Sequence, residues 1–182
     1  MKINKKIADR ASVQQYGNKA RIEDVVIFDL TRHIDCGGSF NEIIRMVDDC
    51  TVNTENFVAM MPGDVKQVNY SEVLPGAIKA GHYHLKQEDY WFVTPRSRLL
   101  VGLKDLREDS PTFGSVMRIV MGDGKAQLLV IPEGVLHGVA NLGQESGDLF
   151  YFTTNHFNIE DPDEYRLPPE EFGEAFWEIQ KG

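Results

Sequence analysis

The feature that most constrains the fold is a series of short apolar runs, each rich in β-branched or aromatic residues and each bounded by turn residues. The runs are Val25–Phe28, Phe57–Met60, Tyr90–Val93, Leu99–Leu103, Val116–Val120, Leu128–Ile131 and Leu149–Phe152. Turn signals separate them, among them Pro62-Gly63, Pro75-Gly76 and Gly122-Asp123-Gly124. Many short strands punctuated by glycine and proline indicate an all-β sandwich or barrel.

The length of the chain and the character of its ends suggest one domain with two extensions. A chain of 182 residues suits a single domain with a sizeable core. Residues 1–21 are polar with little periodicity, and we expect a loose N-terminal arm there. We expect a β-barrel over residues 22–158. The tail over residues 159–182 is acidic and aromatic, and its aromatic side chains are expected to pack on the barrel or on a partner subunit.

The charge of the chain disfavours several classes of partner. A formal net charge of −9 argues against duplex nucleic acid and anionic membrane surfaces, because both need a basic protein face. No apolar run approaches the roughly 20 residues that span a bilayer, and the N-terminus lacks the apolar segment of a secretory signal. The two cysteines are too few for a disulfide framework. We therefore expect a cytoplasmic protein that binds a small molecule, with neither nucleic acid nor membrane as partner.

Three of the five histidines fall in two short segments that suggest one polar site. His82 and His84 are two residues apart, so on a strand both side chains project from the same face. Glu88 follows four residues later and can return to that face after a tight turn. His137 comes shortly after the Pro-Glu-Gly turn at residues 132–134. If the strands close into a barrel, these side chains face a small guest inside it.

The two histidine segments resemble the two motifs of the cupin superfamily, whose fold is a double-stranded β-helix or jelly-roll barrel. The first reads glycine, five residues, His-x-His, three residues, glutamate; the second reads Pro-x-Gly, two residues, histidine, three residues, asparagine. In metal-binding cupins the matching residues hold one ion, and imidazoles with a carboxylate suit Fe, Mn, Zn, Ni or Co. The resemblance implies an all-β jelly roll and four candidate metal ligands: His82, His84, Glu88 and His137. The alternative is that these residues line the barrel without a metal.

A longer resemblance covers about residues 22–167. Its segments include Asp35-Cys-Gly-Gly-Ser-Phe40-Asn-Glu42, Asp105-Leu-Arg107, Ser110-Pro-Thr-Phe-Gly114 and Ile131-Pro-Glu-Gly-Val-Leu-His137-Gly138. By these segments the chain resembles the dTDP-4-dehydrorhamnose 3,5-epimerases and related nucleotide-sugar epimerases, which are cupins without a metal. The resemblance implies an isomerase of a 4-keto nucleotide sugar that needs no cofactor. It also implies a homodimer in which the segment around Phe40 and Glu42 reaches a neighbour.

The family resemblance also assigns roles to single residues. His82 matches the general base that removes the acidic hydrogen beside the 4-keto group, and Tyr151 matches the acid that returns a proton on the other face. His137 belongs to the same catalytic group. The alternatives are that Tyr151 only packs in the core and that Arg107 only orients a turn. The implied substrate-binding residues are Lys79, Phe40, Glu42, His156 and Arg107.

Several positions depart from the family pattern. Gly37 stands where the family has an arginine for the nucleotide phosphates, and Lys79 replaces an active-site arginine, which loses the bidentate fork. Asp89 aligns with the lysine that stabilises the enolate, so the charge there is reversed. A metal ion could replace that lysine as a Lewis acid, but a metal-bound His82 could not also be the base.

The sequence therefore leaves three functions open. The first is an epimerase or a related isomerase of a 4-keto nucleotide sugar, favoured by the Asp-Leu-Arg and Ser-Pro-Thr-Phe-Gly segments. The second is a metal-dependent cupin oxygenase or isomerase, favoured by the His-x-His-x3-Glu spacing. The third is a cupin that binds a sugar without turning it over. The replacements at Gly37 and Asp89 favour the second and the third.

Overall fold

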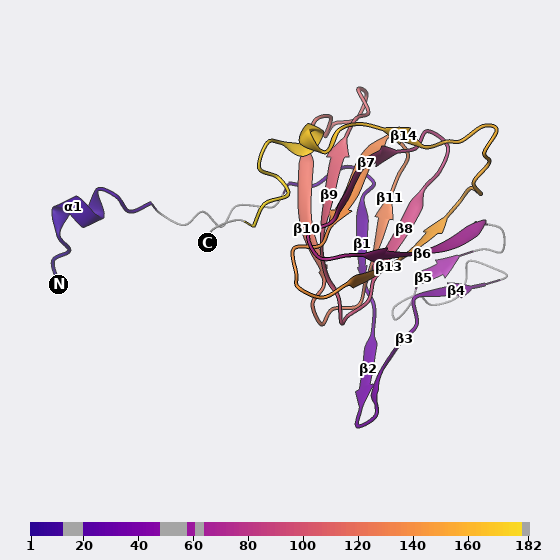
Figure 1. Cartoon of the computed structure of the whole chain (residues 1–182), viewed down its shortest axis with the longest axis horizontal. Coiled ribbons are helices and arrows are strands. Elements are labelled where there is room, and N and C mark those ends of the chain that lie inside the picture. The colour runs from indigo at the N-terminus through magenta and orange to yellow at the C-terminus, as the bar shows by residue number, and fades with distance from the viewer. Residues whose placement is uncertain (13–19, 48–57, 61–63, 180–182) are drawn as a thin grey trace.

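The barrel consists of two five-stranded sheets that face each other (Figure 1). The computed structural model describes residues 1–12, 20–47, 58–60 and 64–179 of the chain. Within each large sheet all neighbouring strands are antiparallel. Two facing sheets bury their inner faces against each other, so the short apolar runs of the sequence share one core.

The chain passes back and forth between the two sheets. The first sheet has the order β1 (Val26–Asp29), β11 (Gln127–Ile131), β8 (Asp89–Val93), β13 (Gly147–Thr153) and β6 (Gln67–Val73). The second has the order β10 (Val116–Gly122), β9 (Arg98–Asp105), β12 (Val135–Ala140), β7 (Ile78–Tyr83) and β14 (Tyr165–Arg166). From β6 to β9, and from β10 to β14, each connection crosses to the other sheet. This topology confirms the predicted jelly-roll cupin fold.

Burial on both faces explains why β9 reads as an unbroken apolar run. Leu99, Val101 and Leu103 belong to the core cluster between the two sheets. Leu100, on the opposite face of the strand, is also buried, because the C-terminal tail covers that face. A strand covered on both faces needs no alternating polar residues. The apolar run of β9 therefore packs against the core on one face and against the C-terminal tail on the other.

The C-terminal tail packs on the outer face of the second sheet. It includes the short 3₁₀ helix η1 (Pro169–Phe172), and it contributes the buried side chains of Phe172 and Trp177 to a cluster with residues of the sheet. Gly102 allows this close approach, because a Cβ at that position would lie 2.5 Å from the ring of Phe176. Apolar burial thus holds the tail, and β14 within it extends the edge of the second sheet.

The N-terminal part of the chain buries less than the barrel does. The helix α1 (Lys5–Ala8) contains no buried residue, and every described residue of the expected arm is exposed. A hairpin of β2 (Arg32–Asp35) and β3 (Gly38–Asn41) projects beyond the barrel (Figure 1). β4 (Ile44–Met46) and β5 (Val58–Met60) form a parallel pair. Among the described residues, no helix has the length and apolar character needed to cross a bilayer.

Candidate active site

A cavity of about 390 Å³ lies inside the barrel. Strands β6, β8 and β13 of the first sheet and β7 and β12 of the second contribute to its lining. The tail adds Asp163, Glu164 and Arg166. This volume is in the range of about 300–1,000 Å³ that is typical of small-molecule sites.

The three histidines predicted for the site lie together in this cavity. His82 in β7 is paired in register with His137 in β12, and their ring centroids are 6.4 Å apart. His84 directly follows β7, and its ring centroid lies 5.2 Å from that of His137. Pairing of two adjacent antiparallel strands therefore joins the two histidine segments of the sequence.

Asp89 at the start of β8 faces two of these histidines. The residue is 3% exposed, and its carboxylate accepts hydrogen bonds from Gln87 Nε2 at 2.7 Å and from Trp91 Nε1 at 3.0 Å. Its Oδ1 lies 3.8 Å from His84 Nε2, and its Oδ2 lies 3.7 Å from His137 Nε2. The three possible ligand atoms of His84, Asp89 and His137 all lie within 4.8 Å of one another.

Glu88, the carboxylate predicted for this site, does not line the cavity. Its side chain accepts a hydrogen bond from the Tyr90 hydroxyl at 3.1 Å. Successive side chains of a strand point to opposite faces, and Asp89 shares the inner face with Trp91, a residue of the central core. The predicted metal set therefore differs from the observed group at two positions: Asp89 and not Glu88 faces His84, and His82 is outside the group of three ligand atoms that lie within 4.8 Å of one another.

His137 is the most deeply buried of the three histidines, at 2% exposed. Its Nδ1 lies 3.0 Å from the backbone oxygen of Val135. A carbonyl oxygen can only accept, so Nδ1 carries the proton and Nε2 presents a lone pair toward Asp89. Burial lowers the pKa of His137, and the negative charge of Asp89 only partly opposes that effect, so the ring is neutral at pH 7.

His82 is only partly buried and lies beside the tail. Because β14 pairs with β7, Arg166 stands opposite His82 in the sheet. Burial lowers the pKa of His82 below its ordinary value, and the charge of nearby Glu164 opposes this shift. The net effect is a lowered pKa, so His82 is a neutral imidazole at pH 7 and can accept a proton.

Gly81 lets the tail approach His82 closely. Its φ of +84° lies in the left-handed region that favours glycine. Leu167 N donates a hydrogen bond to the Gly81 carbonyl at 2.7 Å. A Cβ at Gly81 would collide with the carbonyl oxygen of Leu167. Any larger residue there would push the tail, and Glu164 with it, away from the histidine.

Tyr151 in β13 lines the cavity from the sheet that faces His82. Burial raises the pKa of the Tyr151 phenol, and the negative charges of Asp89 and Glu164 raise it further. The phenol is therefore protonated at neutral pH and can donate a proton. A proton acceptor and a proton donor thus line one cavity from two different sheets.

Two of the predicted substrate-binding residues, Lys79 and His156, line the cavity. Lys79 lies in β7, and its Nζ donates hydrogen bonds to Ser71 Oγ and to the backbone oxygen of Glu72, both at 2.8 Å. His156 is exposed and follows β13. Both are therefore in positions from which they can contact a bound molecule.

Phe40 and Glu42, also predicted to bind substrate, are absent from the described lining of the cavity. Phe40 is 65% exposed in the projecting hairpin, where its ring stacks on that of His33. Glu42 forms an ion pair with Arg45 at 2.6 Å. The hairpin that carries Phe40 projects beyond the barrel (Figure 1), and Glu42 follows its second strand.

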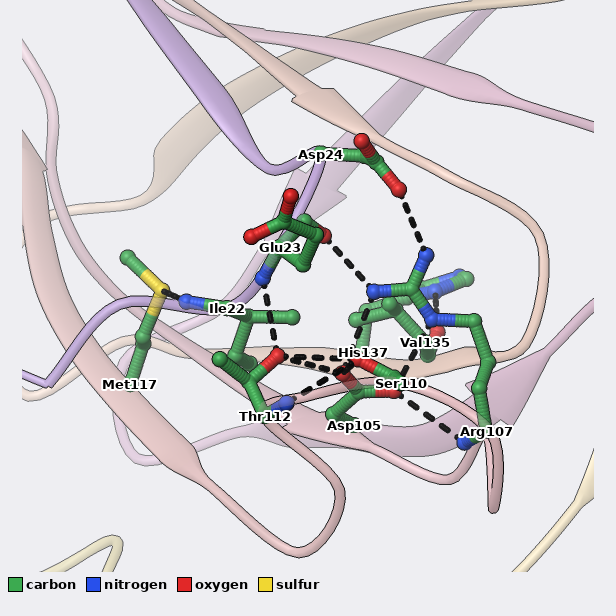
Figure 2. A network of polar contacts seen from close by, with 10 residues as sticks. All are labelled: Ile22, Glu23, Asp24, Asp105, Arg107, Ser110, Thr112, Met117, Val135 and His137. Atoms are coloured by element: carbon green, nitrogen blue, oxygen red, sulfur yellow. Dashed lines mark hydrogen bonds and ion pairs between the residues drawn. The ribbon is translucent and has the colours of Figure 1, made fainter.

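Arg107, the remaining predicted substrate ligand, is held in a polar network instead of the cavity (Figure 2). Its guanidinium donates to both oxygens of Asp105 at 2.9 and 3.1 Å, to Asp24 at 3.0 Å, and to a backbone oxygen at 2.7 Å. The other side-chain donors to Asp105 are the hydroxyls of Ser110 and Thr112. These contacts agree with the alternative that Arg107 orients a turn, and its role in substrate binding stays a prediction.

Two acidic residues of the cavity were not predicted as site residues from the sequence: Glu164 was not named, and Asp89 was named only as the replacement of a family lysine. Asp89 carried a usable signal, because counting back two residues from the buried Trp91 gives the inward face of the strand. Glu164 carried none, because it approaches His82 only through the pairing of β14 with β7.

Known proteins resemble the chain over most of its length. The chain is 42% identical over 147 residues to the spore coat polysaccharide biosynthesis protein SpsL of Bacillus subtilis, a match that covers 81% of this chain and 89% of that protein. It is 35% identical over 148 residues to the probable low-salt glycan biosynthesis epimerase Agl13 of Haloferax volcanii. That match covers 81% of this chain and 88% of the other protein.

A solved structure and a family model agree with these relatives. The crystal structure of dTDP-4-dehydrorhamnose 3,5-epimerase from Sulfolobus tokodaii matches with a TM-score of 0.67 and 25% identity, covering 92% of this chain and 85% of that one. The model of the family described as dTDP-4-dehydrorhamnose 3,5-epimerase matches residues 19–176. The chain therefore belongs to the dTDP-4-dehydrorhamnose 3,5-epimerase family.

Proposed function

We propose that the chain inverts a carbon beside the keto group of a 4-keto nucleotide sugar, with His82 as the base and Tyr151 as the acid. Membership of the family makes the chain an epimerase of such sugars. The residue assignment rests on one observation: β7 and β13 belong to facing sheets, and both side chains line the same cavity. A planar enolate between them loses a proton on one face and gains one on the other.

The protonation states at neutral pH support these two roles. The pKa of His82 is lowered, so the imidazole is ready to accept a proton, and the pKa of Tyr151 is raised, so the phenol keeps the proton that it must deliver. When the surroundings move the pKa values of two groups apart, one group can act as the base and the other as the acid. His137, neutral and buried beside them, completes the catalytic group as a polar wall of the cavity.

Lys79 supplies positive charge for the substrate in this proposal. Ser71 and the Glu72 carbonyl use two of its three N–H donors. One donor remains for an oxygen of the enolate or of the nucleotide phosphates. His156, exposed at the cavity, contacts the sugar or its nucleotide from the other sheet.

Glu164 acts as a positioning residue for the base. Its negative charge favours the protonated form of His82, which arises when the base has taken the substrate proton. The C-terminal tail supplies this charge beside His82.

Deuterium exchange tests the proposal directly. A 4-keto nucleotide sugar, for example the dTDP form, is incubated with the enzyme in D₂O, and deuterium at the carbons beside the ketone is followed by NMR. We expect wash-in with the wild type and none with His82→Asn. Tyr151→Phe should still exchange, because base and enolate remain, but should not release the inverted product. Exchange that survives in His82→Asn contradicts the assignment of the base.

The two other functions that the sequence left open fare differently. Because the family consists of epimerases, the chain is an enzyme, and a purely sugar-binding role is set aside. Metal-dependent cupin chemistry keeps one supporting observation, the approach of His84, Asp89 and His137 to one another. Oxygen consumption in the presence of Fe²⁺ would reveal an oxygenase, and its absence would leave the epimerase alone.

A homodimer completes the proposal. Phe40 and Ile34 expose most of their apolar side chains on the projecting hairpin, at 65% and 71%, and a second copy of the chain would cover them. Light scattering measures the mass, and a monomer at micromolar concentration contradicts the dimer. The cytoplasmic location expected from the sequence stays a prediction, to be tested by cell fractionation.

A further inference from the structure

Three groups that accept hydrogen bonds converge on one point of the cavity wall. They are His84 Nε2, His137 Nε2 and the carboxylate of Asp89, and each side chain is buried, with 8% of His84, 2% of His137 and 3% of Asp89 exposed. They come from three segments that only the fold brings together: the end of β7, the start of β8, and β12.

The tautomers of the two histidines make this convergence unusual. The Nδ1 atom of His84 contacts the backbone oxygen of Asp163, and the Nδ1 atom of His137 contacts that of Val135. In the neutral form of each ring the proton therefore lies on Nδ1, and Nε2 presents its lone pair toward the Asp89 carboxylate. In that form two imidazole nitrogens and one carboxylate face one another. A cation at their centre would satisfy all three.

The spacing suits a metal ion better than a hydrogen bond. The Nε2 atoms lie 3.8 and 3.7 Å from the two oxygens of Asp89, too far for direct hydrogen bonds. With metal–ligand bonds of about 2.1 Å, two ligand atoms of one tetrahedral ion lie about 3.4 Å apart. The three ligand atoms all lie within 4.8 Å of one another, so binding one ion would draw them closer by at most about 1.4 Å.

Neighbouring groups hold each of the three side chains in place. Trp91 Nε1 and Gln87 Nε2 each donate to one oxygen of Asp89, at 3.0 and 2.7 Å. The backbone carbonyls at Asp163 and Val135 fix the imidazole rings. Outer hydrogen bonds of this kind orient the ligands in protein metal sites.

We propose that His84, Asp89 and His137 bind one divalent transition-metal ion in the wall of the cavity. Two imidazoles and one carboxylate suit Mn, Fe, Co, Ni or Zn. Three protein ligands leave coordination positions for a water or a substrate oxygen. This set leaves His82 unbound, so metal binding and the role of His82 as base no longer compete.

Cobalt binding by untagged protein tests the site without any substrate. The protein is stripped with a chelator, dialysed, and titrated with Co²⁺ while the visible absorption of the bound ion is recorded. We expect one Co²⁺ per chain in the wild type. Loss of an outer hydrogen bond alone typically weakens metal binding 10–100-fold, so loss of a ligand in Asp89→Asn or His84→Gln should weaken it by more than about 100-fold.

Glu88→Gln is the matched control, because it removes the neighbouring carboxylate that faces away from the cavity. It should bind Co²⁺ as the wild type does, and so should His82→Asn. Wild-type protein that takes up no Co²⁺ overturns the proposal. Asp89→Asn that binds like the wild type, or Glu88→Gln that binds as weakly as Asp89→Asn, also overturns it.

A fluorescence readout guards against misfolded variants. Trp91 donates to Asp89 and its ring centroid lies 5.2 Å from that of His137, so bound Co²⁺ should quench its emission. The measurement uses Trp177→Phe as the background, which leaves Trp91 as the only tryptophan of the chain. Quenching in this background and its loss when His84→Gln is added support the site, provided thermal unfolding shows that both proteins are folded. Absence of quenching in folded Trp177→Phe contradicts it.

The metal proposal and the proposed function fail separately. Co²⁺ binding is measured without a sugar, whereas epimerisation is measured by deuterium exchange. Protein that binds Co²⁺ but shows no exchange keeps the metal site and loses the epimerase mechanism. Protein that catalyses deuterium exchange but binds no Co²⁺ keeps the epimerase mechanism and loses the metal site.

Discussion

Two buried aspartates in the same barrel have very different surroundings. Asp105, at the end of β9, is fully buried and accepts five hydrogen bonds, from Arg107 and from the hydroxyls of Ser110 and Thr112. Asp89, at the start of β8, is almost as buried and accepts two, both from neutral groups. The first carboxylate is paired with a cation, while the second faces two imidazole rings and the cavity.

This difference in surroundings distinguishes a carboxylate with a structural role, Asp105, from a carboxylate of the candidate active site, Asp89. A buried charge that is fully paired stabilises a particular backbone arrangement, here the turn after β9 (Figure 2). A buried charge without a cationic partner costs free energy, and proteins retain such groups where they bind or react. Variants of the two regions should therefore affect different measurements.

The largest effect is expected at the cavity. His82→Asn removes the base, and we expect the rate of deuterium exchange to fall on the order of 10³-fold, within the usual range for a general base. Exchange is measured by NMR with saturating 4-keto nucleotide sugar. The urea midpoint should stay near that of the wild type, since no described hydrogen bond depends on this ring. A large loss of stability in His82→Asn would instead indicate a structural role for His82.

Asp105→Asn should show the opposite pattern. Removing one partner of a buried ion pair typically costs about 3–5 kcal/mol, because the guanidinium of Arg107 keeps its charge without its carboxylate. Urea unfolding followed by tryptophan fluorescence measures the free energy of unfolding. The exposed Asp109 of the same turn provides the control, and Asp109→Asn should stay within about 0.5 kcal/mol of the wild type. Equal losses in the two variants would argue against the network.

The pH dependence of stability should identify the same carboxylate. Hydrogen bonds from Arg107, Ser110 and Thr112 outweigh burial and hold the pKa of Asp105 well below its ordinary value. Its stabilising contribution is therefore complete above about pH 4 and is lost as the pH falls toward the lowered pKa. Unfolding free energies measured from pH 5 downward should converge for the wild type and Asp105→Asn. Curves that stay parallel would contradict the pairing.

The smallest effect concerns Glu164. Its charge raises the pKa of His82 against the effect of burial, so Glu164→Gln should lower that pKa further. The base then stays neutral to lower pH, and the acidic limb of the exchange rate should move to lower pH than in the wild type. A residue with a merely structural role would reduce the rate without moving the limb. The full pH profile of both proteins distinguishes the two outcomes.

Much of the fold was predictable because its signals are local. Short apolar runs between glycine and proline turns predicted an all-β barrel, and the spacing of His82, His84 and His137 predicted that they share one site. Both inferences need only strand alternation and closure. The sequence pattern placed Glu88 in this site, whereas Asp89 faces the histidines, because the length of the turn before β8 decides which side chain points inward.

The sequence by itself determined the jelly-roll class, the family and the histidines of the cavity, because strand periodicity and motif spacing are properties of short segments. The tertiary structure alone decided that Glu164 accompanies His82 and that Arg107 reaches Asp24 and the Glu23 carbonyl. These contacts join segments far apart in the chain, so they depend on strand pairing and on packing between segments. No local sequence pattern predicts contacts between such distant residues.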